Sequence, residues 1–559
     1  MDLAFDPGAA AALPDGRPLV PALLARGASG AVVAPHHLAT AAGLGILRAG
    51  GSAVDAAIAT NAVLAVVMGS ACGIGGDAFW LVWDAPSAAL VALNGSGRSA
   101  ARHLEVVEAA GLSRMPIRGP LSITVPGAVA SWGEAHARWG RLAREAILGP
   151  AIELADGGFA ASAAWAASVE AAARAFDSPA WGRVYRPLGR PWRPGERVRL
   201  PALAGTLRRI AAAGFADLYV GDLAAAQAAG LAAVGSPIDA ADLAAHTTDV
   251  RSPLTTTYRG VTVATHPPNS SGVVGLEILR ILERMGAPDP SVLGEGRGAG
   301  VAWTHAGIEA AKLALADRDA FLTDPDAVPV PVDAILSDDH VADLAASIDR
   351  RRASEPAPSR LPRGGGTIYL ATVDHDGNAV SLIESNYMGF GSGVVDPATG
   401  IAYQNRGSYF SLDPSAANRL APRKRTLHTL MPAMLLRDGR PWVVVGSMGG
   451  DAQPQIHAQV VPALVDGGLS AAAAVAMPRW FVDPPEHFAP PRIVRVEPRV
   501  GRETIEGLRA MGHDVAVAQP FDPGLGHCHA IELVDGGPAM GGTLAAATDP
   551  RSEGAPAAW

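Results

Sequence analysis

The chain has 559 residues, a length that suits three or four average domains or one large layered core. Its 45 basic and 54 acidic residues give a net charge of −9, and it lacks the basic stripe that nucleic-acid binding requires. Apolar residues make up 49% and charged residues 18%, as is typical of a folded protein with a buried core. With two cysteines, Cys72 and Cys528, the sequence excludes a disulfide scaffold and a four-thiolate zinc site.

The sequence predicts neither a secretory signal nor a membrane span. The first residues, MDLAFDPGAAAALPDG, have no basic start and no sustained apolar run. Residues 56–76 carry no charge, but they include polar residues and glycines and are flanked by Asp55 and Asp77. This pattern favours a buried helix that runs into a glycine turn. We therefore expect a cytoplasmic protein.

The first half of the chain predicts mostly helices with a few strands. A strand and two helices are predicted within 31–68; the first helix ends at Gly50-Gly51, and Ser52 caps the second. A glycine turn at 73–76 and a strand at 78–84 follow. Residues 121–140 predict a strand, a Pro-Gly turn and a helix, and residues 140–260 predict mainly helices with a surface loop at 186–202.

The second half changes from helices to strands at a linker. Its predicted elements are a helix at 273–286 that Ser270-Ser271 can cap, a helix at about 301–322, a flexible linker at 351–366, a β-hairpin at 367–385, a strand at 442–446 and a strand through 527–534. In the last strand, His527 and His529 fall on one face, and this alternation favours a strand over a metal site.

At the boundary between Gly366 and Thr367, the linker ends at a hydroxyl residue that begins a strand. A threonine hydroxyl becomes nucleophilic when a base lies beside it, and the α-amino group of an N-terminal threonine is such a base, with an ordinary pKa of about 7.7–8. Attack of the Thr367 hydroxyl on the preceding carbonyl, followed by hydrolysis of the ester, would create that N-terminus. The glycines at 364–366 tolerate the strained backbone that this attack demands. A plain linker before a strand is the alternative.

Residues 442–450, WVVVGSMGG, predict a buried strand that ends in Gly449-Gly450. Adjacent glycines at a strand end can direct two backbone N–H groups into a cavity, as an oxyanion hole requires, although a tight turn is the alternative. The residues around Ser447 fail the GxSxG pattern of serine hydrolases at Val445. The sequence also contains no Walker loop, HExxH motif or intact dinucleotide fingerprint.

Several segments together resemble the γ-glutamyltransferase family of the N-terminal nucleophile hydrolase superfamily. They are GGSAVDAA (50–57), GIGGDAF (73–79), VPGAVASW (125–132), PPNSSG (267–272), HAGIEAAKLALADR (305–318), GGGT (364–367) followed by VDHDGNAVSLI (373–383), and GSMGG (446–450). They occur in the family's order and span nearly the whole chain.

The resemblance implies an α+β fold with four αββα layers, in which two stacked antiparallel sheets lie between helices. It implies cleavage into a large subunit, residues 1–366, and a small subunit, residues 367–559, which share one core as a heterodimer or a dimer of heterodimers. Thr367 matches the family's nucleophile, Ser385 stands where a second threonine usually bonds the new N-terminus, and Gly449 and Gly450 match the oxyanion glycines. The implied chemistry is an acyl-enzyme on Thr367, and it requires no metal or cofactor.

The substrate-binding positions depart from the glutamyl pattern. The segment that usually carries an acidic pair reads QNRGSYF here, so Arg406 and Tyr409 stand where no carboxylate remains. Candidate substrate-binding residues are therefore Arg98, Tyr387, Arg406, Tyr409, His428 and Thr429. Loss of the acidic pair together with the gain of Arg406 and His428 should weaken binding of an ammonium group and favour an anion. An internal ion pair of Arg406, with a pocket that still accepts glutamyl groups, is the alternative.

Three hypotheses follow from these residues. The first is a self-cleaving threonine amidohydrolase that acts on a small amide with a carboxylate in its acyl part, similar to the branch that includes oxamate amidohydrolase and some acylases. The second is a true γ-glutamyltransferase or glutathione hydrolase. The third is an uncleaved, inactive relative that works as a binding protein.

Overall fold

The computed structural model describes residues 23–176, 178–289, 293, 298–355, 366–482 and 493–559. The N-terminal segment at 1–22 and the linker residues 356–365 lie outside the described residues. None of the described helices is long and apolar enough to cross a membrane.

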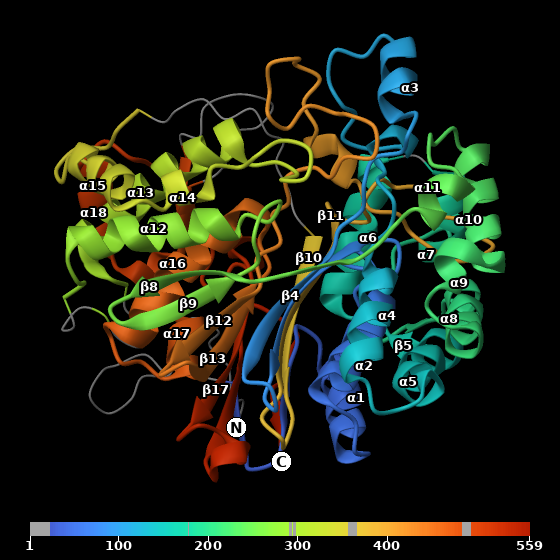
Figure 1. The fold of residues 1–559 in the computed structure, drawn as a ribbon, viewed down its shortest axis with the longest axis horizontal. Helices are drawn as coiled ribbons and strands as arrows, with labels where there is room; N and C mark the ends of the chain where they lie inside the picture. Colours follow the sequence, from blue (N-terminus) through green and yellow to red (C-terminus); the bar gives the residue numbers. More distant parts are fainter. Residues whose placement is uncertain (1–22, 177, 290–292, 294–297, 356–365, 483–492) are drawn as a thin grey trace, which may run out of the picture.

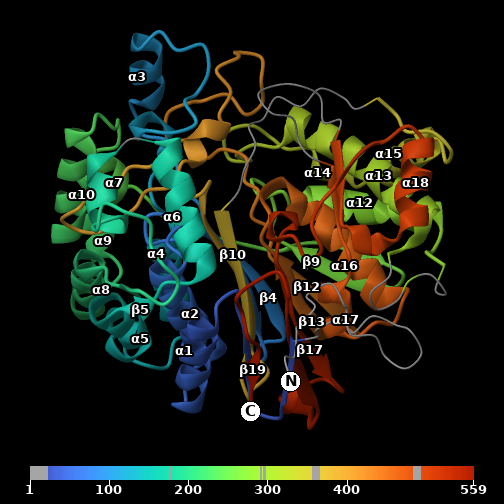
Figure 2. The same ribbon diagram turned by 180° about the vertical axis from the view of Figure 1, so that it is seen from behind.

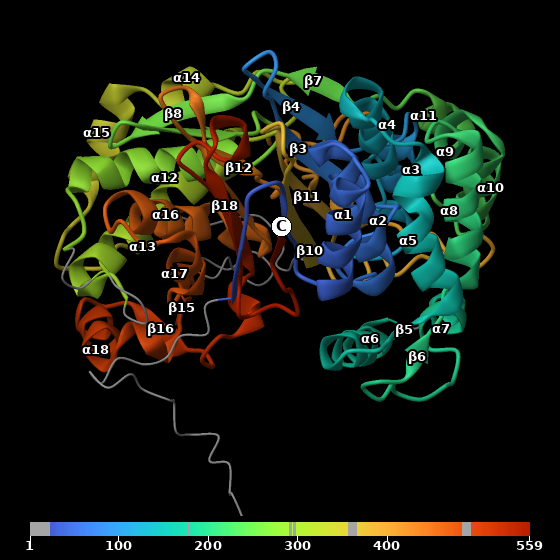
Figure 3. The same cartoon turned by 90° about the horizontal axis from the view of Figure 1, so that it is seen from below.

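Two seven-stranded sheets lie face to face at the centre of the molecule (Figures 1 and 3). Neighbouring strands are antiparallel throughout both sheets. In spatial order, the first sheet contains β1 (Leu23–Gly27), β18 (Thr543–Thr548), β17 (Cys528–Val534), β13 (Arg440–Ser447), β12 (Ala433–Arg437), β9 (Val261–Thr265) and β8 (Leu254–Tyr258). The second contains β19 (Ala557–Ala558), β2 (Ala31–Val33), β10 (Gly366–Val373), β11 (Ala379–Tyr387), β3 (Asp77–Asp84), β4 (Ala89–Gly95) and β7 (Asp249–Arg251).

Helices cover the outer side of each sheet, and Figure 2 shows the same layers from behind. On the side of the second sheet are α1 (His37–Arg48), α2 (Ala53–Val67), α3 (His103–Ala109), α4 (Ala128–Trp139), α5 (Arg144–Gly157), α6 (Ala163–Ala175), α7 (Pro179–Tyr185), α8 (Pro201–Ala213), α9 (Asp217–Val220), α10 (Asp222–Ala233) and α11 (Ala240–Ala244). On the side of the first sheet are α12 (Gly272–Met285), α13 (Gly300–Phe321), α14 (Val332–Ile335), α15 (Asp338–Ser347), α16 (Gln453–Val465), α17 (Ala471–Ala476) and α18 (Arg502–Ala510). The predicted four-layer αββα fold is confirmed.

Two small sheets lie outside this sandwich. One contains β14 (Trp480–Val482), β15 (Ile493–Val496) and β16 (Asp514–Val517), and the other contains β5 (Phe159–Ala160) and β6 (Arg197–Val198). β15 and β16 form a parallel pair.

Apolar side chains from both sheets fill the space between them. The buried residues of this layer include Phe79, Leu81, Tyr369, Ala371, Val373, Ile383, Met434, Val444 and Ile531. The alternate residues of β10, Ile368 and Leu370, pack instead against the layer that contains α2. Strand β10 is therefore buried on both faces, which explains its nearly continuous apolar sequence.

Helix α2 forms where the sequence predicts it. Ser52 accepts a hydrogen bond from the Asp55 backbone, and the Asp55 carboxylate accepts one from the Ser52 backbone, so the two residues form a capping box. Every residue of α2 is buried. The uncharged stretch from residue 56 is therefore a core helix, as expected.

One local prediction is wrong and another is confirmed only in part. Residues 121–125 form no strand, because the Val125 N–H donates to Arg98 in a loop and the Ile123 N–H closes a short 3-10 turn on Pro120. At the start of α12, the Ser270 Oγ accepts a hydrogen bond of 3.1 Å from the Gly272 N–H, whereas the Ser271 side chain makes no cap bond. Both hydroxyls also donate to backbone carbonyls in the 428–430 segment, so long-range contacts hold this helix start as well.

Burial of many titratable groups makes stability depend on pH. Burial lowers the pKa of nine histidines: His36, His103, His246, His266, His428, His457, His513, His527 and His529. Burial raises the pKa of five carboxyl groups: Asp77, Glu277, Asp374, Glu384 and Asp451. When burial lowers the pKa of a histidine in the folded state, the unfolded chain takes up a proton at a higher pH than the folded chain does. Stability is therefore greater at neutral pH and is lost as the pH falls below about 6.5, the pKa of the unfolded state. The carboxyl groups with a raised pKa have the opposite effect, because they stabilise the fold as the pH falls.

Because the lowered histidines outnumber the raised carboxyl groups, we expect the melting temperature to fall when the pH is lowered from 6.5 to 4.5. Burial lowers the pKa of His457 to about 3, so its share of the loss over this interval is on the order of 3 kcal/mol. A His457→Gln variant should show a shallower fall in thermal scans, whereas His375→Gln, at a side chain that is 74% exposed, should not change the slope. A melting temperature that stays constant or rises on acidification would contradict this expectation.

Candidate active site

Thr367 lies at the start of β10, where the pairing with β11 is irregular between Gly366 and Ile368. Its Oγ1 lies 3.0 Å from the Oγ of Ser385, which shares a face of β11 with Ile383, a residue packed between the sheets. Thr367 therefore lies on the side that faces the other sheet, where the Tyr369 ring also packs. The Tyr369 ring approaches the backbone of Gly446 in β13 so closely that it leaves no space for a Cβ atom there. The start of β10 therefore lies directly across from the last residues of β13.

Strands β10 and β13 run in opposite directions across the sandwich. Gly377, in the turn that follows β10, lies against Ala539, and Arg440, at the start of β13, contacts the neighbouring Met540. The end of β10 is therefore close to the start of β13. It follows that the start of β10 and the glycines beyond the end of β13, Gly449 and Gly450, lie at the same end of the two sheets.

Ser385 in β11 contacts both sides of the Gly366–Thr367 peptide bond. Its Oγ lies 3.0 Å from the Thr367 Oγ1 and donates a hydrogen bond of 2.6 Å to the Gly366 carbonyl oxygen. The same Oγ accepts a hydrogen bond of 2.7 Å from the Tyr387 N–H. The hydroxyl of Ser385 thus connects the predicted nucleophile to the carbonyl that this nucleophile would attack.

Gly449 and Gly450 form a turn that only glycine adopts readily. Their φ angles are 143° and 57°, and a 3-10 helix (Gly450–Ala452) and then α16 follow. Among the described residues, none accepts a hydrogen bond from the backbone N–H of Gly449 or Gly450. The Gly449 carbonyl, in contrast, accepts one from the Ala452 N–H. Two donors at the end of β13 therefore remain available to an oxyanion.

Two tyrosines connect the end of β11 to this turn. Tyr387 pairs across the ladder with Gly366, and its ring centroid lies 4.6 Å from that of Tyr409. The Tyr409 hydroxyl lies 3.4 Å from both carboxylate oxygens of Asp451, the residue after Gly450, and Asp451 is paired at 2.5 Å with Arg318 of α13. A chain of contacts thus joins the cleavage position to the glycine turn.

Arg406 is a buried cation that forms no ion pair among the described residues, although the carboxyl groups of Asp77 and Asp451 are near enough to act on its pKa. It is only 1% exposed, and its guanidinium carbon lies 4.4 Å from the Tyr387 ring centroid and 5.4 Å from that of Tyr409. One nitrogen donates to the Thr429 hydroxyl at 3.1 Å, whereas Nε and Nη2 have no hydrogen-bond partner among the described residues. Burial lowers the pKa of Arg406. An unpaired buried guanidinium is costly for a protein to maintain, and an incoming anion would compensate it.

Both ring nitrogens of His428 are occupied by protein groups. Its Nε2 lies 3.2 Å from an Asp77 carboxylate oxygen, and its Nδ1 accepts from the Leu430 N–H. Burial lowers the pKa of His428 well below its ordinary value and raises that of Asp77 to about 7. His428 is therefore a neutral ring held by protein groups, and it adds no positive charge beside Arg406.

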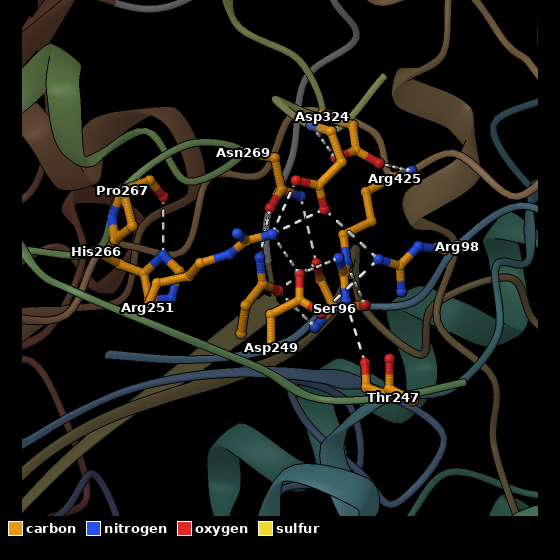
Figure 4. A network of polar contacts seen from close by, with 12 residues as sticks. Ser96, Arg98, Thr247, Asp249, Arg251, His266, Pro267, Asn269, Asp324 and Arg425 are labelled. Atoms are coloured by element: carbon orange, nitrogen blue, oxygen red, sulfur yellow. Dashed lines mark hydrogen bonds and ion pairs between the residues drawn. The ribbon is translucent and has the colours of Figure 1, made fainter. Parts of the chain in front are cut away.

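Arg98 lies in a separate ion network rather than beside Arg406 (Figure 4). Its guanidinium lies 3.7 Å from Asp249 and 3.8 Å from Asp326. Arg425, which is buried, pairs with the same Asp249 at 2.5 Å. Since Arg98 is already close to two carboxylates, it is a weaker candidate than Arg406 for binding a substrate carboxylate.

Several residues that shape this site were not predicted from the sequence. Asp451 and Arg318 form the buried pair described above, and the only signal in the sequence is the position of Asp451 directly after GSMGG. Glu384 was also missed: its carboxylate accepts from the Gly73 N–H at 3.0 Å and from Asn61, and so it fastens the glycine turn to β11 behind Ser385. Burial raises the pKa of Glu384 to about 8.

Comparison with known proteins identifies the family of this chain. The model of the gamma-glutamyltranspeptidase family matches residues 39–559. The glutathione hydrolase-like YwrD proenzyme of Bacillus subtilis is 40% identical over 528 residues, which cover 94% of this chain and 97% of the relative. The oxamate amidohydrolase proenzyme of Klebsiella pneumoniae is 40% identical over 543 residues, which cover 95% of this chain and 98% of the relative.

A solved structure extends the agreement to the fold. The crystal structure of cephalosporin acylase from Bacillus halodurans superposes with a TM-score of 0.88 at 37% identity, and the match covers 99% of each chain. The family model, the full-length relatives and the solved structure all indicate the same family. The chain belongs to the gamma-glutamyltranspeptidase family.

Proposed function

We propose that the chain cleaves itself between Gly366 and Thr367 and then hydrolyses small amides whose acyl part carries a carboxylate. Cleavage would give a large subunit of residues 1–366 and a small subunit of residues 367–559. The two would remain one heterodimer, because β10 of the small subunit is hydrogen-bonded to β2, and β11 to β3, of the large subunit.

The contacts of Ser385 support a route for the cleavage. As the Thr367 Oγ bonds to the Gly366 carbonyl carbon, its proton can pass to Ser385 Oγ, 3.0 Å away. Ser385 already donates to the Gly366 oxygen, on which negative charge develops. Breakage of the carbon–nitrogen bond, with that proton delivered to the departing Thr367 nitrogen, leaves an ester on Thr367 and a free α-amine, and water then cleaves the ester.

The freed amine would act as the base for turnover. It takes the Thr367 hydroxyl proton while Oγ attacks the substrate amide, and the unpartnered N–H groups of Gly449 and Gly450 can hold the resulting oxyanion. The proton then goes to the departing amine. Water attacks the acyl ester in the second half of the reaction and regenerates Thr367.

The unpaired guanidinium of Arg406 is the observation that carries the proposed substrate class. It lies against Tyr387, which faces Gly366 across the ladder, and two of its nitrogens have no partner among the described residues. A carboxylate in the acyl part of the substrate would satisfy both donors and neutralise the buried charge. The similarity to a protein named oxamate amidohydrolase supports the same class.

A substrate panel tests this proposal. We expect the processed protein to hydrolyse glutaryl-p-nitroanilide and oxamate, and to act on the glutaryl amide at least about tenfold faster in kcat/KM than on γ-glutamyl-p-nitroanilide, a difference of about 1.4 kcal/mol. The two anilides differ only in an α-ammonium group, which lies unfavourably near a buried guanidinium. Butyryl-p-nitroanilide, which lacks the carboxylate, serves as the neutral control. Preference for the γ-glutamyl anilide would contradict the proposal.

A γ-glutamyl amide is the second candidate substrate, and Asp451 is the observation that favours it. This carboxylate follows the glycine turn, lies 3.4 Å from the Tyr409 hydroxyl, and could receive an α-ammonium group. Its pairing with Arg318 at 2.5 Å opposes this role, because the carboxylate is already neutralised. The same panel decides between the two candidates.

A further inference from the structure

Three side chains from separate helices converge in the layer that covers the first sheet, away from Thr367. They are Glu277 of α12, Asp317 of α13 and His340 of α15, three helices that lie close together in Figure 1. His340 Nε2 lies 2.7 Å from an Asp317 oxygen and 3.5 Å from the Glu277 Oε1. One potential ligand atom from each residue lies within 4.8 Å of the others.

Glu277 lacks a compensating partner. It is 1% exposed, and its Oε1 has no hydrogen-bond partner among the described residues. The two arginines of the same helix, Arg280 and Arg284, pair with Asp338 instead. The two carboxyl groups, Glu277 and Asp317, thus share one neighbouring imidazole, that of His340.

A second cluster of the same type shows what a compensated arrangement looks like. His305, Glu309 and His513 also converge and are all buried. There, however, the Lys312 ammonium lies 2.7 Å from the Glu309 carboxylate and supplies the positive charge. Among the described residues, the Glu277 cluster has no such lysine or arginine, in contrast to the Glu309 cluster.

We propose that Glu277, Asp317 and His340 bind one divalent zinc ion. The donor set of one imidazole nitrogen and two carboxylate oxygens suits Zn²⁺, whose bonds of about 2.0–2.2 Å place tetrahedral ligands roughly 3.3 Å apart. The His340–Glu277 separation of 3.5 Å is close to this value, and the His340–Asp317 hydrogen bond of 2.7 Å would open when the ion binds. Asp317 and His340 are 20% and 35% exposed, which gives the ion an entry path and leaves room for a water ligand. The ion would tie α12, α13 and α15 together, and its role would be structural.

Calorimetry with ZnCl₂ on processed, chelator-treated and dialysed protein tests this site. We expect one Zn²⁺ per heterodimer and a melting temperature that rises with Zn²⁺ but not with an equal concentration of Mg²⁺. Glu277→Gln and His340→Ala should each weaken Zn²⁺ binding at least about tenfold. The glutamine variant is especially informative, because it has nearly the shape of a protonated Glu277 and should fold normally.

Two further variants separate this site from adventitious binding. His375→Ala removes an exposed histidine and should leave binding unchanged, as should His513→Gln in the lysine-compensated cluster. Absence of Zn²⁺ binding, wild-type binding by Glu277→Gln, or binding that is lost only with His513→Gln would each overturn the proposal. Cleavage and amide hydrolysis are measured separately and do not depend on the outcome.

Discussion

A Thr367→Ala variant is expected to remain a single chain of 57.0 kDa and to lose at least about 10⁴-fold in activity. The substitution removes the Oγ that must attack the Gly366 carbonyl, so the cleavage has no nucleophile. Without cleavage, residue 367 keeps an amide nitrogen rather than a basic amine. Wild-type protein should give bands of about 37 and 20 kDa, in proportion to subunit lengths, and mass spectrometry should find Thr367 as the new N-terminus.

Two variants serve as controls for this result. Thr367→Ser keeps a hydroxyl and, after cleavage, an amine, so it should be cleaved and retain measurable activity. Ser415→Ala removes an exposed hydroxyl at a residue that is not part of the candidate site, and this variant should behave like the wild type. A cleaved, active Thr367→Ala variant would refute the proposed nucleophile. A wild-type protein that persists as one band without activity would favour the alternative of an inactive binding protein.

The sequence was sufficient for the parts of the fold that depend on local patterns. Ser52 and Asp55 cap α2 because serine and aspartate in that spacing satisfy the free N–H groups of a helix start. The hairpin of β10 and β11 is equally local, since the turn at Asp374–Asn378 separates two apolar runs. Residues 121–125 show the limit: a β-like pattern forms no strand because its backbone is bonded to a distant loop at Arg98.

The spacing of residues along the sequence was not sufficient to predict the candidate site. Resemblance supplied Thr367, Ser385 and the two glycines, but the pair of Arg318 and Asp451 links residues 133 positions apart. Whether an arginine has a counter-ion is likewise a three-dimensional property. The sequence names both Arg98 and Arg406 as candidates, with Arg98 displaced by about two residues from the position where the resemblance expects an arginine, and it does not show which of them has a counter-ion.

Replacement of Arg406 by methionine is expected to lower kcat/KM for glutaryl-p-nitroanilide by about 10²- to 10³-fold, mainly through KM. Removing one partner of a buried charge pair costs about 2–5 kcal/mol, and in the bound state the substrate carboxylate would be the partner left unpaired. Turnover of butyryl-p-nitroanilide should change little, because that substrate presents no charge to Arg406. The free protein should stay folded, since Arg406 forms no ion pair among the described residues that its loss could break.

Arg98→Met provides the matched comparison, because both variants remove one guanidinium from a candidate carboxylate-binding position. Loss of Arg98 affects contacts with Asp249 and Asp326, which are long and partly exposed, so stability should change modestly and the KM for the glutaryl anilide by less than about threefold. Arg406→Lys refines the test: an ammonium keeps the charge but loses the paired donors, so an intermediate KM is expected. If Arg98→Met rather than Arg406→Met abolished the preference for the glutaryl over the butyryl anilide, the substrate carboxylate would lie at the ion network and not between the two tyrosines.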